Sequence, residues 1–283
     1  MKIIECPRDA MQGLHEYVPT EDKIEYINQL IKVGFDTIDF GSFVSPKAIP
    51  QMQDTQEVLS HLDLKGSNTK LLAIIANERG AHDAIAFPSI SYLGFPLSLS
   101  ETFQRKNTNK SIVEAMEELA IIQNICLEHN KTLVTYLSMG FGNPYGDPYE
   151  SNLVLDMIEK LKQLGIGIIS LADTVGVSTP DNIKSLFQVV TANFEGIEFG
   201  VHLHSDRDTA MSKIAAAYKA GCRRFDGAIN GFGGCPMAND KLVGNIATEL
   251  MLEYFEERNV SVNYDKKALS KALNMAPKVF LGR

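Results

Sequence analysis

A regular alternation of strand-like and helix-like segments is the feature that most constrains how this chain folds. Short apolar runs typical of buried strands are each followed by a longer segment with apolar residues at helical spacing. Parallel strands need a crossover between them, and helices of this length provide it. The predicted strands are Ile3–Glu5, Thr37–Gly41, Lys70–Ala76, Ser91–Phe95, Thr132–Ser138, Gly167–Ala172, Glu198–His202 and Arg224–Ala228.

Eight strand–helix units in 283 residues match the size of a closed (β/α)8 TIM barrel. We therefore predict one catalytic α/β domain over residues 1–283, with the barrel ending at about residue 257 and an additional C-terminal helical extension over about 258–283. Among the helices, Thr20 is expected to cap Thr20–Val33, and the last helix is expected over Lys267–Asn274. A doubly wound open sheet is the competing architecture.

Composition excludes several classes of protein. The formal net charge of −8 argues against nucleic acid as a partner. No apolar run approaches the roughly 20 residues that span a bilayer, and the N-terminus lacks the apolar region of a signal peptide. We therefore expect a cytoplasmic protein without a membrane partner. The four cysteines form no CxxC pattern, which predicts reduced thiols rather than a disulfide framework or zinc ribbon.

Two histidines, His202 and His204, close the seventh predicted strand. Side chains at positions i and i+2 of a strand point to the same face, so these imidazoles make half of a divalent metal site. Arg8-Asp9, after the first strand, offers a carboxylate to complete the site and a cation beside it. Because chemistry in TIM barrels sits at the C-terminal ends of the strands, these residues are expected to meet there, together with Asp39, Asp173 and Asp226.

The metal that suits such a site follows from its donor atoms. Imidazoles combined with oxygen ligands, without a thiolate, favour Mg2+ or Mn2+ over structural zinc. Catalytic zinc is the alternative metal for this site. The loop that contains Cys235 is either an ordinary glycine-rich turn or a mobile lid that carries a thiol to the site. Lys47 and the basic pair Arg105-Lys106 are either solvated surface or contacts for an anionic substrate.

These motifs together resemble the metal-dependent lyase and Claisen-condensing barrel enzymes, and most closely the hydroxymethylglutaryl-CoA lyase family. The likeness rests on Arg8-Asp9 and the His-x-His pair, and it extends in order over nearly the whole chain. The further matching segments are Ser42–Lys47, Ser100–Asn107, Asp173–Gly176, Gly233–Pro236 and Gly244–Glu249.

The resemblance implies roles for particular residues. One divalent cation, Mg2+ or Mn2+, would be held by Asp9, His202, His204 and Asn245. The catalytic set would be Arg8, which stabilises an enolate, Cys235, which takes part in proton transfer, and the acidic positions Asp39 and Asp173. The substrate would contact Arg8, Gln12, Ser45, Lys47 and Lys106.

The implied reaction is cleavage of 3-hydroxy-3-methylglutaryl-CoA, or a close 3-hydroxyacyl-CoA, to acetyl-CoA and acetoacetate by a homodimer. Asp39 replaces the family's usual glutamate, and Ser205–Asp208 and the segment from Cys235 to Asn245 also depart from the usual pattern. These changes concern the acyl group more than the reaction. A condensing synthase acting on a 2-oxo acid and a non-catalytic metal-binding barrel are the alternatives; Arg8 and Cys235 argue against the latter.

Overall fold

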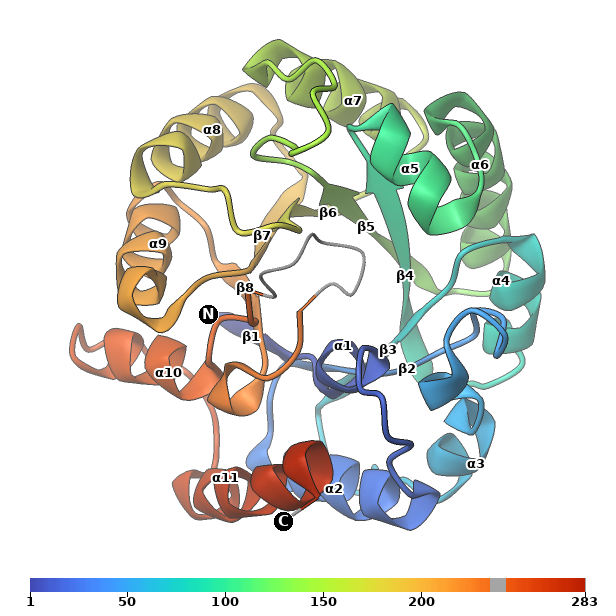
Figure 1. Cartoon of the computed structure of the whole chain (residues 1–283), viewed down its shortest axis with the longest axis vertical. Helices are drawn as coiled ribbons and strands as arrows, with labels where there is room; N and C mark the ends of the chain where they lie inside the picture. Colours follow the sequence, from blue (N-terminus) through green and yellow to red (C-terminus); the bar gives the residue numbers. More distant parts are fainter. Residues whose placement is uncertain (235–242, 283) are drawn as a thin grey trace.

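Eight parallel strands close into a barrel at the centre of the molecule (Figure 1). The structure is a computed structural model that describes residues 1–234 and 243–282. Each strand pairs with its neighbours in sequence, and β8 pairs with β1 to close the ring. The strands are β1 (Lys2–Glu5), β2 (Thr37–Ser42), β3 (Lys70–Ile74), β4 (Ile90–Ser98), β5 (Thr132–Ser138), β6 (Ile168–Asp173), β7 (Glu198–Leu203) and β8 (Arg224–Gly227). The predicted TIM barrel is confirmed.

Helices surround this ring and cover its outer face (Figure 1). Their apolar faces pack on the strands in one continuous core. The described helices are α1 (Pro7–Gln12), α2 (Thr20–Val33), α3 (Thr55–Ser60), α4 (Glu78–Ile85), α5 (Glu101–Thr108), α6 (Ile112–Glu128), α7 (Ser151–Gln163), α8 (Pro180–Asn193), α9 (Arg207–Lys219), α10 (Thr248–Glu256) and α11 (Lys266–Leu281), with 3-10 turns η1 (Pro50–Met52) and η2 (Ile229–Gly231).

Two details of the helices differ from the prediction. Thr20 is the first helical residue of α2 rather than its cap, because Pro19 takes the cap position and the Thr20 hydroxyl donates to Asp54 Oδ2 instead. Helix α11 continues past Asn274 to Leu281 and contains Pro277. It packs beside α2, where Gln29 Nε2 donates to the Ala268 carbonyl at 2.8 Å. The predicted additional C-terminal helix is therefore present.

The barrel interior is partly polar. A small apolar cluster fills one part of it, formed by Leu72, Ile74, Val134, Tyr136 and Ile168. Arg224 on β8 is fully buried, and Gly200 on the neighbouring strand leaves room for it: a Cβ at Gly200 would lie 2.9 Å from Arg224 Cδ. A buried cation needs nearby negative charge, and Glu198 Oε1 lies 3.5 Å from Arg224 Nη1.

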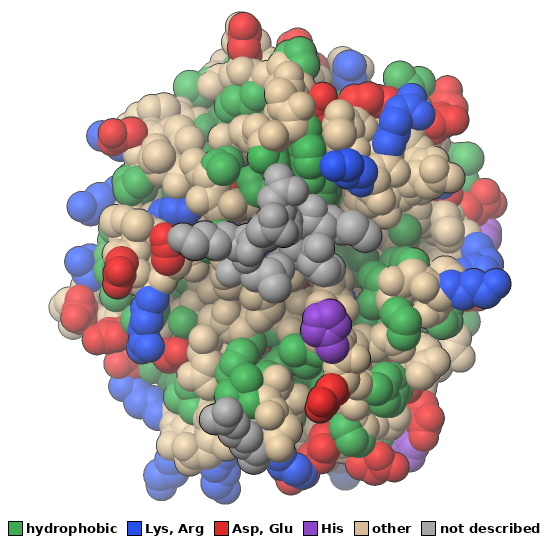
Figure 2. All heavy atoms as spheres, in the orientation of Figure 1, with side chains coloured by type: hydrophobic (Ala, Val, Ile, Leu, Met, Phe, Trp, Pro, Cys, Tyr) green, Lys and Arg blue, Asp and Glu red, His purple; other side chains and the backbone are tan. Residues whose placement is uncertain are grey.

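The outer surface shows where the charged groups lie. Figure 2 shows lysine, arginine and acidic side chains mainly around the edge of the viewed face, with hydrophobic and uncharged groups nearer its centre. Within the described residues, no helix combines the length and the apolar character needed to cross a membrane.

Candidate active site

A cavity of about 220 Å³ opens where the C-terminal ends of the strands meet. It brings together residues from α1, the loop after β2, helix α5, and five strands, β3 to β7, or the loops that follow them. Its lining consists of Arg8, Asp9, Gln12, Val44, Ala48, Ile49, Ile74, Ala76, Pro96, Phe103, Asn107, Thr108, Tyr136, Ser138, Ala172, Thr174, His202 and His204. Four of the residues predicted from sequence to form a metal and enolate site therefore share one cavity.

Asp9, His202 and His204 form the group in this cavity that is suited to hold a metal ion. Their ligand atoms all lie within 4.8 Å of one another and all three side chains are buried. The two Nε2 atoms are 3.2 Å apart, and Asp9 Oδ2 lies 3.9 Å from the first and 4.0 Å from the second. Two imidazole nitrogens and a carboxylate that converge in this way fit a divalent cation of the Mg2+ or Mn2+ type.

Asn245, the fourth predicted ligand, is held against this group. It pairs with His204 through a β-bridge, and its Nδ2 donates to Asp9 Oδ2 at 2.8 Å and to the Phe232 carbonyl at 2.9 Å. Gly233 makes the close approach possible, because a Cβ there would lie 2.7 Å from both Ala10 Cα and Asn245 Nδ2. The predicted set of four is thus assembled from segments far apart in the sequence.

Arg8 lies beside the metal-binding group and is fixed by its neighbours. Its Nε donates to Asp39 Oδ2 at 3.0 Å, and its Nη2 donates to the same oxygen at 2.5 Å. Its NH1 group donates to Asp9 Oδ1 at 3.1 Å and to Gln12 Oε1 at 2.9 Å. The rigid, planar guanidinium is therefore held in one orientation. Asp39 acts in this structure as the anchor of Arg8.

The charges of the site are set by burial and by these neighbours. Burial opposes ionisation of Asp9, but Arg8 and the two imidazoles outweigh it and lower the pKa of Asp9 to about 2. Burial raises the pKa of Asp39 to about 6, although Arg8 acts in the opposite direction. Burial, followed by the neighbouring His202, lowers the pKa of His204 to about 4. His204 is therefore neutral near pH 7 and has a lone pair to offer a cation.

Asp173 is turned away from the metal-binding group. Its Oδ1 accepts from the Val177 amide and its Oδ2 from the Ser178 amide, both at 2.9 Å, which fixes the loop between β6 and α8. The buried Lys213 of α9 donates to Asp173 Oδ2 at 3.3 Å and to the His204 carbonyl at 3.0 Å. This contact places Asp173 behind His204, although its predicted catalytic role remains untested.

The predicted substrate contacts lie in different places. Gln12 lines the cavity and donates from Nε2 to Asp9 Oδ1 at 2.9 Å. Ser45 is half-buried and Lys47 exposed in the loop after β2, while the neighbouring Val44 and Ala48 contribute to the lining. Lys106 is exposed on α5, with its Nζ 4.3 Å from the centre of the Tyr145 ring. Cys235 lies outside the described residues.

Three residues at the site were not assigned a role from sequence. Tyr136 lines the cavity and stands edge-on to His202, with ring centres 5.8 Å apart. Lys213 and Asp226 contact the two histidines from behind. Asp226 is recognisable as an acid within a predicted barrel strand, whereas nothing in the sequence of α9 distinguishes Lys213 from the other lysines.

The chain is similar to known proteins in both sequence and fold. The family model described as HMGL-like matches residues 2–276. Hydroxymethylglutaryl-CoA lyase of Bacillus subtilis is 35% identical over 266 residues, which is 94% of this chain and 88% of the relative. (R)-citramalyl-CoA lyase of Chloroflexus aurantiacus is 28% identical over 276 residues, which is 94% of this chain and 86% of the relative. Among solved structures, the chain is similar to an HMG-CoA lyase from Acinetobacter baumannii in complex with coenzyme A and 3-methylmalate. The two superpose with a TM-score of 0.92 at 31% sequence identity, over 99% of this chain and 91% of the other.

Proposed function

Since this chain belongs to the HMGL-like family and is a carbon–carbon lyase of that family, we propose that it cleaves 3-hydroxy-3-methylglutaryl-CoA to acetyl-CoA and acetoacetate with a bound Mg2+ or Mn2+. The observation that carries this proposal is the shared cavity of Arg8 with Asp9, His202 and His204. Metal binding alone would not require a buried guanidinium beside the ligands.

The four predicted ligands Asp9, His202, His204 and Asn245 would hold the cation. When bound, it would supply Lewis acidity toward the oxygen atoms of the substrate. Asp9 lies on α1 and His202 on β7, while His204 and Asn245 follow β7 and precede α10 and pair with each other through a β-bridge. Burial keeps water away from these ligands, which strengthens electrostatic interactions inside the cavity.

Arg8 would act on the charge that the reaction creates. Cleavage requires a general base in the cavity that takes the proton of the 3-hydroxyl group. The carbon–carbon bond then breaks, which forms the ketone of acetoacetate and leaves the electron pair of that bond on the carbon next to the thioester. The resulting negative charge is shared with the thioester oxygen. A guanidinium that is held in place and always charged stabilises such an enolate without having to reorganise. Cys235 is the proposed proton donor to the enolate carbon.

The apolar part of the cavity supports an acyl substrate. Ile74, Pro96, Phe103 and Tyr136 line it together with small side chains such as Ala172. Pockets for small molecules typically combine an apolar lining with a few polar groups that fix orientation. Because one relative is named for citramalyl-CoA and one structural neighbour holds 3-methylmalate, a citramalyl-CoA substrate is the second candidate.

The test is a comparison of substrates with the purified full chain. The protein is treated with a chelator, supplied with Mg2+ or Mn2+, and incubated with 3-hydroxy-3-methylglutaryl-CoA or citramalyl-CoA. Metal-dependent formation of acetoacetate, with the higher kcat/KM for the first substrate, is the expected result. Release of free CoA from acetyl-CoA and a 2-oxo acid, without lyase activity, would indicate a synthase. Metal binding without either activity would indicate a non-catalytic barrel.

A further inference from the structure

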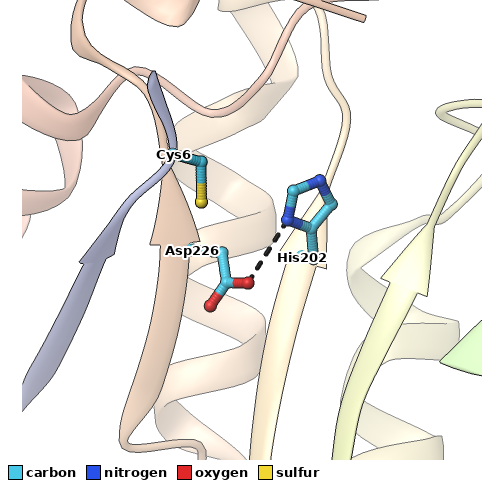
Figure 3. Close-up of side chains that lie close together, drawn as sticks. All are labelled: Cys6, His202 and Asp226. Atoms are coloured by element: carbon cyan, nitrogen blue, oxygen red, sulfur yellow. Dashed lines mark hydrogen bonds and ion pairs between the residues drawn. The ribbon is translucent and has the colours of Figure 1, made fainter. Parts of the chain in front are cut away.

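The two ring nitrogens of His202 face different surroundings. Its Nε2 faces the cavity, where His204 Nε2 and Asp9 Oδ2 lie. Its Nδ1 faces the neighbouring strand β8, where Asp226 Oδ2 is 3.3 Å away, as the dashed line in Figure 3 marks. A neutral imidazole has one proton on one of these nitrogens. The partner of Nδ1 therefore decides whether Nε2 presents a lone pair or a proton to the cavity.

Asp226 can determine which ring nitrogen of His202 carries the proton. Its side chain is fully buried, and an ionised carboxylate can only accept hydrogen bonds. Arg224 lies two residues earlier on the same strand, so that both side chains point to the same face of the sheet. Its fully buried guanidinium attracts Asp226 electrostatically and offsets the cost of a buried negative charge.

We propose that Asp226 is a positioning residue of the metal site, which keeps the proton of His202 on Nδ1 and thereby leaves the Nε2 lone pair facing Asp9 and His204. The inference rests on the proposed metal dependence of the lyase. A carboxylate behind a metal-binding histidine fixes its tautomer and its ring orientation and raises its basicity. Asp226 touches neither cavity nor substrate in this role; it acts through His202.

Cys6 offers a second interpretation of the same cluster. Its Sγ lies within 4.8 Å of the ligand atoms of His202 and Asp226, and Figure 3 shows the three side chains close together. A second cation here would need the Nδ1 lone pair and would displace the proton from that atom. The hydrogen-bond distance between Nδ1 and Asp226 favours the proton, and the Cys6 thiol is directed to the Ile4 carbonyl at 3.6 Å.

The first experiment measures the tautomer directly in metal-free protein. The full chain is labelled with 15N in its six histidines, and the signals of His202 are identified by their loss in His202→Asn. Although burial opposes it, Asp226 and Asp9 raise the pKa of His202, so the spectra are recorded at alkaline pH, where the ring is neutral. We expect a protonated Nδ1 and an unprotonated Nε2 in the wild type under these conditions. A neutral ring that carries its proton on Nε2 would overturn the proposal. Since no substrate is involved, this result is independent of whether the lyase reaction is confirmed.

The second experiment measures Mn2+ binding by calorimetry. Asp226→Asn can donate an amide hydrogen to Nδ1, which favours the wrong tautomer, so Mn2+ affinity should fall by about 10- to 100-fold. Cys6→Ala is the matched control and should leave the affinity unchanged. Unchanged affinity in folded Asp226→Asn would contradict the proposal. Binding of two Co2+ ions per chain, with a thiolate charge-transfer band that disappears in Cys6→Ala, would instead identify the cluster as a second metal site.

Discussion

Arg8 combines a permanent charge with a fixed orientation, and this combination can be tested apart from the metal. In Arg8→Gln, the side chain still reaches toward Asp9, but no positive charge remains for the enolate. We expect turnover to fall by at least about 100-fold while Mn2+ affinity stays within a few-fold of the wild type. Steady-state kinetics together with calorimetry measures both. Turnover near the wild-type value would exclude Arg8 from the chemical step.

Asp39 provides a related test at the neighbouring position. Both of its oxygens are occupied by Arg8, so that Asp39→Asn should loosen the guanidinium without removing it. We expect kcat to fall by about 10-fold or more, with a smaller effect on KM, because orientation matters most in the transition state. An effect confined to KM would show instead that Asp39 serves substrate binding.

Cys235 is the predicted proton donor, a role that the family resemblance implies. Cys235→Ala should slow turnover by about 100-fold or more without changing the unfolding midpoint, because a general acid contributes this much and the change removes only one thiol. Cys126→Ala provides a control at a buried cysteine distant in sequence from the site. An unchanged rate in Cys235→Ala would make this thiol incidental.

Spacing along single strands explains how much of the site the sequence predicts. His202 and His204 are recognisable because two residues on one strand must share a face, and Asp9 follows from the shared barrel rim. Asp226 is expected at the same rim, but its contact with His202 Nδ1 emerges only from the packing of β8 beside β7. Lys213 reaches the His204 carbonyl only through the packing of α9. The roles of Ser45, Lys47 and Lys106 came from resemblance and remain predictions.

At the scale of elements, the length of a helix or strand decides whether the spacing of its apolar residues can predict it. The strands and the long helix α2 lie at or close to their predicted positions, since the apolar residues of such elements repeat over several turns or alternations. Helices α1 and α5 are too short for a repeat to be visible, yet they supply Arg8, Asp9, Gln12 and Phe103 to the cavity. The elements least visible in the sequence therefore contribute much of the cavity lining.

Lys213 links helix α9 to the last residue of β6, Asp173, and to His204 directly after β7, which gives a prediction at this scale. Lys213→Met should lower the free energy of unfolding by about 3 kcal/mol, because it leaves the buried Asp173 without its cation. Urea unfolding measures this change. The double variant Lys213→Met/Asp173→Asn should recover part of the loss. A double variant as unstable as the single one would show that packing, rather than charge, is responsible.

At the scale of the whole molecule, the alternation of predicted strands and helices indicates a closed barrel. It does not indicate the polar contacts where the first and last strands meet. The seam between β1 and β8 contains Glu5, which is fully buried. Its carboxylate accepts from the Ile229 amide at 2.9 Å and from the Thr248 hydroxyl at 2.5 Å. Sequence patterns place Glu5 at a strand end, where an exposed acid would be equally compatible, so the buried role could emerge only from the assembled barrel.

This buried carboxylate predicts how the stability of the barrel depends on pH. Burial raises the pKa of Glu5 to about 8, despite the two hydrogen bonds that favour ionisation, whereas an unfolded glutamate has a pKa of about 4.3. Between these values the folded protein holds a proton that the unfolded chain has released, so the free energy of unfolding falls as pH rises, by up to about 1.4 kcal/mol per pH unit. Glu5→Gln, measured by urea unfolding at pH 5.5 and pH 8.5, should lose less stability between the two values than the wild type. The exposed Glu253→Gln should behave like the wild type. If the wild type and Glu5→Gln lose the same free energy of unfolding between the two pH values, Glu5 does not titrate between pH 5.5 and pH 8.5.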